Sequence, residues 1–210
     1  MRREFHVRFC EGGGVRFPSA TRLVILFTSE SDARRTMEVL PKRFAKYGLT
    51  LHPEKTKLIQ FHRPNHPPRS RAEGARPGTF DLLGFTHYWA LTRKGTWAVQ
   101  RQTMRKRLAR GLRGIAEWCR RHLHLKVSKQ HSALSAKLRG HYQYYGITGN
   151  SRALGVFYRQ VTRLWQRWLQ RRNRENSMPW SRFAALLKHY PLPLPRVVHS
   201  ALRPAANPIP

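Results

Sequence analysis

The chain has 210 residues and a formal net charge of +31 at pH 7, because 41 lysines and arginines face only 10 acids. No apolar run approaches the roughly 20 residues that a membrane-spanning helix needs, and Cys10 and Cys119 are too few for a disulfide framework or a cysteine-rich zinc site. A hydrophobic content of 40% excludes a disordered basic tail. We therefore expect a folded cytoplasmic protein that binds nucleic acid rather than a membrane.

The first part of the chain predicts a small mixed unit. Residues 1–14 show no clear period and end in three glycines, so we expect a poorly ordered start without regular structure and assign it to no domain. The apolar run from Leu23 to Phe27 predicts a buried strand. A helix should begin near Asp32 after a serine cap, be kinked or split by Pro41, and end at Gly48. Its apolar face is predicted to hold Ala33, Met37, Leu40, Phe44 and Tyr47.

Short strands and a linker are predicted next. Leu49 and Leu51 alternate with polar neighbours, and KLIQF at 57–61 has the composition of a strand. Residues 62–79 are rich in proline, arginine and glycine, which predicts an exposed linker. Residues 80–100 predict a hairpin whose strands are joined by Arg93, Lys94 and Gly95.

Apolar spacing of three and four residues then predicts four helices. They cover approximately 101–122, 128–145, 151–172 and 179–190. In the third helix, an apolar stripe contains Leu154, Phe157, Val161, Leu164, Trp165 and Trp168. Arginines 152, 159, 163, 167 and 171 lie mostly off this stripe. Prolines 191, 193 and 195 should end the last helix and extend a proline-rich tail over 191–210.

The stretch KLRGHYQYYGITGN at 137–150 predicts a corner between two helices. Tyr142 and Tyr145 continue the apolar stripe, so we expect them to pack in the core, whereas Tyr144 lies off it and could stack on a base. Gly146 is predicted to end the helix with a positive φ. Asn150 or Ser151 should cap the next helix.

Four stretches together resemble the reverse transcriptases encoded by group II introns, including their maturase domain. They are GLTLHPEKTKLIQF at 48–61, FDLLGF at 80–85, LRGHYQYYGITGN at 138–150 and TRLWQRWLQRR at 162–172. The resemblance implies that the first stretch is the end of the polymerase palm and that FDLLGF belongs to the palm–thumb hairpin. It implies that the basic helices form the thumb, or maturase domain X, which binds intron RNA and assists splicing.

On this resemblance we expect an α+β fold, with a truncated palm-like β/α remnant followed by an antiparallel helical thumb. The implied divisions are 15–61 for the palm remnant, 62–79 for the linker, 80–100 for the hairpin, 101–190 for the thumb and 191–210 for the tail.

One departure from the family concerns catalysis. The family carries an aromatic-Ala-Asp-Asp motif before a strand like LVILF, where the carboxylates hold two metal ions. Here no acid occurs between Glu11 and Glu30. We therefore expect no polymerase activity from this chain alone, and no cofactor unless a separate fingers and palm chain supplies a magnesium site. The alternatives are a subunit of such a split polymerase, a non-functional remnant of a decayed gene, or a basic structural RNA-binding protein.

Candidate site residues follow from charge and position. Lys55 resembles a palm lysine near the incoming nucleotide, although a solvated turn lysine is the simpler interpretation. The histidine pairs His122 with His124 and His131 with His141 lack thiolate partners, so no metal site is assigned. The candidate contacts to group II intron RNA are Lys106, Arg110, Arg113, Arg120, Arg139, His141, Tyr144, Arg152, Arg163, Arg167 and Arg171.

Overall fold

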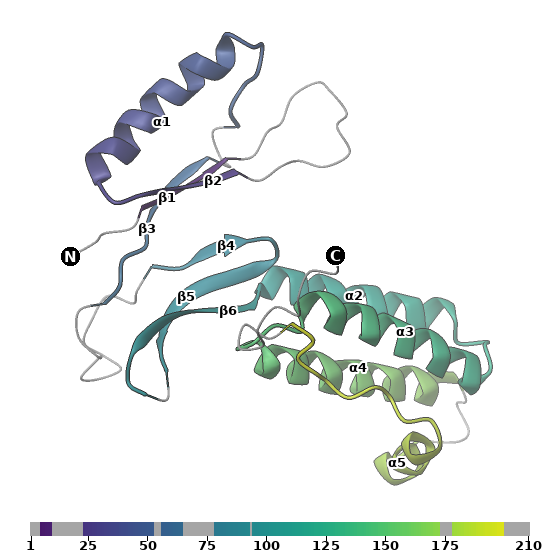
Figure 1. The fold of residues 1–210 in the computed structure, drawn as a ribbon. Helices are drawn as coiled ribbons and strands as arrows, with labels where there is room; N and C mark the ends of the chain where they lie inside the picture. Colours follow the sequence, from purple (N-terminus) through teal and green to yellow (C-terminus); the bar gives the residue numbers. More distant parts are fainter. Residues whose placement is uncertain are drawn as a thin grey trace, which may run out of the picture. The chain divides into compact units, whose positions relative to one another are not determined.

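The computed structural model describes residues 5–9, 23–52, 56–64, 78–92, 94–172 and 178–199. These residues form an α+β protein, as predicted, which divides into two compact units (Figure 1). The first unit contains Met1–Leu82 and His87–Gln100, and the second contains Leu83–Thr86 and Arg101–Pro210.

A three-stranded antiparallel sheet in the order β2-β1-β3 forms the base of the first unit. The strands are β1 (Phe5–Phe9), β2 (Leu23–Phe27) and β3 (Lys57–Gln60). Val7 of the central strand lies opposite both Ile25 and Leu58. The prediction of no regular structure in residues 1–14 is therefore wrong. FHVRF places an apolar residue at every second position, which is the period of a strand, and β1 pairs along both of its edges.

One helix, α1 (Glu30–Ala45), connects β2 with the segment before β3. Pro41 lies inside this continuous helix, so the predicted split does not occur. Gly48 follows the helix with φ of +67°, a conformation that glycine adopts without steric cost. Ser29 stands at the N-cap, but its hydroxyl bonds Ser31 Oγ at 2.7 Å instead of a helix amide. Tyr47, predicted on the apolar face, is 80% exposed because it lies beyond the end of the helix.

A second sheet has the order β4-β5-β6. Its strands are β4 (Phe80–Leu82), β5 (Phe85–Leu91) and β6 (Trp97–Thr103). The predicted hairpin corresponds to β5 and β6. A turn at Leu83 and Gly84, which was not predicted, joins β4 to β5, and its φ values of +49° and +82° have the sign of a type I′ hairpin turn.

Four helices follow at nearly the predicted positions. They are α2 (Arg105–Arg121), α3 (Val127–Tyr145), α4 (Ser151–Arg172) and α5 (Trp180–His189). The first begins later than predicted because β6 continues through Thr103. Pro179 is the N-cap of α5 rather than part of its first turn. Figure 1 shows α2, α3 and α4 side by side.

The core of the second unit lies among these helices. Its largest fully buried side chains are Trp165, Tyr142 and Phe183. Ile115 and Cys119, four residues apart on one face of α2, contribute to this core. The apolar stripes read from the sequence therefore correspond to the surfaces that the helices bury.

Residues 191–199 pack along α3 instead of extending as a tail. Leu192 is 4% exposed and belongs to the core, and the Tyr142 hydroxyl donates a hydrogen bond to the Pro193 carbonyl at 3.0 Å. The amides of Val198 and His199 both donate to the Gly146 carbonyl, at 2.7 and 2.8 Å. This pairing brings a second backbone segment against the end of α3.

That close approach explains the glycine at 146. Its φ is −76°, so the predicted positive φ is wrong. A Cβ at this position would lie 2.9 Å from the Arg196 carbonyl oxygen and would also meet the Tyr142 carbonyl oxygen. Glycine is required here because two backbone segments pass too close for a side chain.

Candidate nucleic-acid interface

Helix α4 has two chemically different sides. The buried side consists of Leu154, Phe157, Val161, Trp165 and Leu169, each no more than 4% exposed. These positions recur every three or four residues, so they form one stripe on a helix. The predicted partners Leu164 and Trp168 are partly buried against the same core.

The other side of α4 presents a row of exposed arginines. Its members are Arg152, Arg159, Arg163, Arg167 and Arg171. From Arg159 onward they are spaced four residues apart, which on an α-helix corresponds to a rise of about 6 Å between neighbours. We call these five residues the α4 arginine row.

The charges of this row are not neutralised within the described part of the second unit. The ion pairs found there join Glu117 with Arg120, at 3.9 Å, and with Arg121, at 2.5 Å. The other acid after Asp81 in the sequence is Glu175, which lies outside the described residues. Successive guanidinium groups without counter-charges repel one another, so a polyanion that neutralised them would be bound favourably.

Helix α2 adds further cations beside α4. Lys106, Arg110 and Arg113 are exposed, as is Arg120 despite its contact with Glu117. The two helices pack closely, since a Cβ on Gly111 would lie 3.2 Å from the ring of Phe157. The exposed cations of both helices thus belong to one packed pair.

His141 has a packing position rather than an exposed one. Its ring stacks on Phe157 with 3.7 Å between the centroids, and its Nε2 atom is buried. Burial lowers the pKa of His141 to about 4, so the imidazole is uncharged at neutral pH. We therefore remove His141 from the candidate phosphate contacts, whereas Arg139 on the same helix is exposed.

Tyr144 and Tyr142 differ as the sequence predicts. Tyr142 is 1% exposed in the core, whereas Tyr144 is 54% exposed. The Tyr144 hydroxyl donates to the Leu83 carbonyl at 2.9 Å, and its ring lies nearly parallel to that of Phe85. Leu83 and Phe85, which the sequence analysis did not connect with the corner, thus hold the exposed ring in place.

Asn150 does not provide the predicted side-chain cap for α4. Its Oδ1 accepts from the Thr103 amide at 2.9 Å. Its Nδ2 donates to Thr103 Oγ1 and to the Tyr145 carbonyl, both at 2.8 Å. With 1% exposure, this amide fixes the end of β6 to the corner between α3 and α4.

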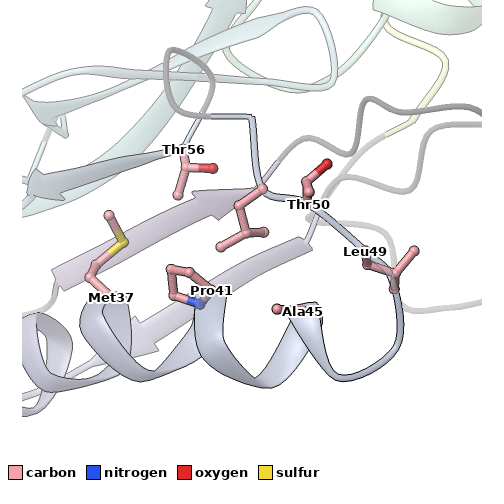
Figure 2. Close-up of a pocket in the computed structure, with 7 residues that line it drawn as sticks. Met37, Pro41, Ala45, Leu49, Thr50 and Thr56 are labelled. Carbon is pink, nitrogen blue, oxygen red and sulfur yellow. The ribbon is translucent and has the colours of Figure 1, made fainter.

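The first unit carries a hollow of about 470 Å³ beside α1 (Figure 2). Met37, Pro41 and Ala45 line it from the helix, and the threonines 50 and 56 complete the wall. Leu49 and Leu51, predicted as strand positions, line the hollow instead. The described residues that line it are all uncharged.

The remaining candidate residues are those considered for catalysis or for metal binding. Lys55 lies outside the described residues, as does the segment where the family's acid pair would stand. Among the residues that the structure describes, histidine, cysteine, aspartate and glutamate form no group of three or more able to hold a metal ion. No described helix is long and apolar enough to cross a membrane.

No family model, curated protein or solved structure matches the chain.

Proposed function

We propose that the chain is an RNA-binding protein of the group II intron maturase type, acting in the cytoplasm to help intron RNA fold and splice. The observation that carries this proposal is the two-sided helix α4. Its apolar stripe is buried, which fixes the helix in the core, and its arginine row stays exposed without an acidic partner among the described residues.

The chemistry of this surface suits the RNA backbone. Arginine presents a planar fork of donors that matches phosphate oxygens in pairs. Such contacts position a nucleic acid without reading its sequence, so the shape of the folded RNA would dominate recognition. The fixed ring of Tyr144 adds a stacking surface for an unpaired base at the corner.

The first unit is, in this proposal, a reduced polymerase palm without its metal-binding carboxylates. We expect the purified chain to extend no primer on an RNA template in the presence of magnesium. The reason is that two-metal catalysis needs an acid pair, which the sequence lacks between Glu11 and Glu30. Templated DNA synthesis by a preparation free of other polymerases would contradict this expectation.

RNA binding is tested by salt titration of the wild-type chain and Arg163→Gln. Counterion release makes log K fall with log salt by about 0.7 per neutralised phosphate on a single strand and about 0.9 on duplex DNA. Arg163→Gln should weaken binding to every RNA to a similar extent and reduce the slope by about one unit.

The control is Arg34→Gln, which removes the same charge from an arginine already paired with Glu30 at 2.7 Å. This variant should leave the slope nearly unchanged. The maturase assignment further requires tighter binding to group II intron RNA than to a control RNA of equal length. Equal affinity of the wild-type chain for both at physiological salt would reduce the proposal to a generic polycation.

A further inference from the structure

The connection between α2 and α3 carries a stack of rings from Trp118, His122 and His124. The centroids of Trp118 and His122 are 4.7 Å apart, with 17° between the ring planes. Those of His122 and His124 are 6.3 Å apart, with 25° between the planes. The rings thus lie in nearly parallel planes, and His124 at the end of the series is exposed. We call these three residues the turn stack.

Buried hydrogen bonds hold this turn in one conformation. Gln130, which is 4% exposed, donates through Nε2 to the carbonyls of His122 and Leu125, at 3.1 and 3.0 Å. Its Oε1 accepts from Trp165 Nε1 at 3.0 Å, which links the turn to the centre of the core. The backbone of the turn is therefore ordered before any ligand binds, so binding does not have to order it.

The ring of His122 is fixed by its own hydrogen bond. Its Nδ1 lies 2.8 Å from the Trp118 carbonyl oxygen, and because a carbonyl can only accept, Nδ1 carries the hydrogen. One of the two nitrogens is thereby committed to the backbone. The structure describes no third ligand with these two histidines, so a stacking role fits them better than a metal site.

Cations flank the turn stack. Lys137 Nζ lies 5.6 Å from the centroid of the Trp118 ring, and Arg172 donates to the Leu125 carbonyl at 3.0 Å. The described acid nearest in the sequence is Glu117, which is paired with Arg121. Lys137 thus lies at the Trp118 end of the stack, and Arg172 brings positive charge to the residue that follows His124.

We propose that the turn stack receives an unpaired RNA base on the exposed ring of His124, with an adjoining phosphate drawn to Arg172. Every base has an aromatic face, so this subsite would bind unpaired nucleotides without selecting a sequence. The inference rests on the proposed RNA-binding function and adds a site that prefers single strands. Its contact with a base differs in kind from the contacts of the α4 arginine row, which would bind phosphates.

The test compares His124→Ala and His124→Tyr with the wild-type chain on a short single-stranded RNA. Alanine should weaken binding by about 5- to 150-fold, the loss expected when one stacked base loses its ring. Tyrosine should preserve the affinity because it keeps an aromatic face. The salt slope should stay unchanged in both variants, since stacking neutralises no phosphate. His189→Ala is the matched control, because His189 is an exposed histidine on α5.

A strand of equal length made of abasic nucleotides separates stacking from charge. It keeps the phosphates but has no bases, so wild-type and His124→Ala should bind it equally. A loss on the abasic strand as large as on RNA, or a His124→Tyr variant as weak as His124→Ala, would overturn the stacking proposal.

The outcomes also separate this inference from the function on which it rests. If the wild-type chain binds RNA and Arg163→Gln lowers the salt slope, but His124→Ala has no effect, only the turn stack fails as a binding site. If the wild-type chain binds no RNA, both proposals fail.

Discussion

Replacing Trp165 with alanine should lower the free energy of unfolding by about 3–5 kcal/mol, the cost of deleting a large buried aromatic side chain. Trp165 is fully buried, and its ring meets that of Phe183 edge to face with 5.7 Å between the centroids. The substitution would also leave Gln130 Oε1 without the indole donor that it binds at 3.0 Å. Thermal melts followed by far-ultraviolet circular dichroism, which reports the helices, measure the effect.

The controls lie on the same helix. Arg163→Ala and Arg167→Ala change exposed positions, each two residues from Trp165 in the sequence, and each should alter stability by no more than about 0.5 kcal/mol. A stability loss from either arginine equal to that from Trp165 would mean that the two sides of α4 are wrongly assigned. The RNA-binding proposal would then lose its main structural support.

The helical part of the fold could be predicted because its signal is local. Each helix buries one stripe, so the spacing of apolar residues located α3 and α4 within about one residue. The strand β1 was missed because its alternation covers only five residues and the glycines that follow suggest a loop. Its partner strands come later in the chain, so the pairing itself cannot be recognised from this short segment.

The candidate site was predictable only in part, for a similar physical reason. Arginines spaced along one helix can be recognised from their sequence positions, whereas contacts between distant segments cannot. The burial of His141 depends on Phe157 from another helix. The position of Tyr144 depends on the turn at Leu83, 61 residues away in the sequence. The turn stack could not be predicted because it depends on the conformation of the chain after α2 ends, which the spacing of apolar residues in the helix does not specify.

Asn150 is another residue whose contacts with a distant segment could not be predicted from the sequence. Its replacement gives the second large expected effect on stability. Asn150→Ala would leave the Thr103 amide and Thr103 Oγ1 without the side-chain partners that they bind at 2.9 and 2.8 Å, whereas the Tyr145 carbonyl keeps the Ile147 amide at 2.9 Å. Each buried group left unpaired costs about 1–3 kcal/mol, so the total loss of stability should be about 2–6 kcal/mol. Urea unfolding followed by circular dichroism measures the change as a lower midpoint at unchanged slope.

Gln143→Ala is the matched control, since it removes an exposed amide side chain from the end of α3. It should change stability by no more than about 0.5 kcal/mol. Asn150→Asp supplies a sharper test, because it keeps the size of the side chain and the oxygen that accepts from Thr103 but replaces the donor to Tyr145 with a second acceptor. If the hydrogen bonds hold the corner together, Asn150→Asp should be nearly as destabilising as Asn150→Ala. An aspartate variant as stable as the wild-type chain would show that the donor to the Tyr145 carbonyl contributes little, and that the corner is held instead by the packing of Tyr142 and the backbone pairing at Gly146.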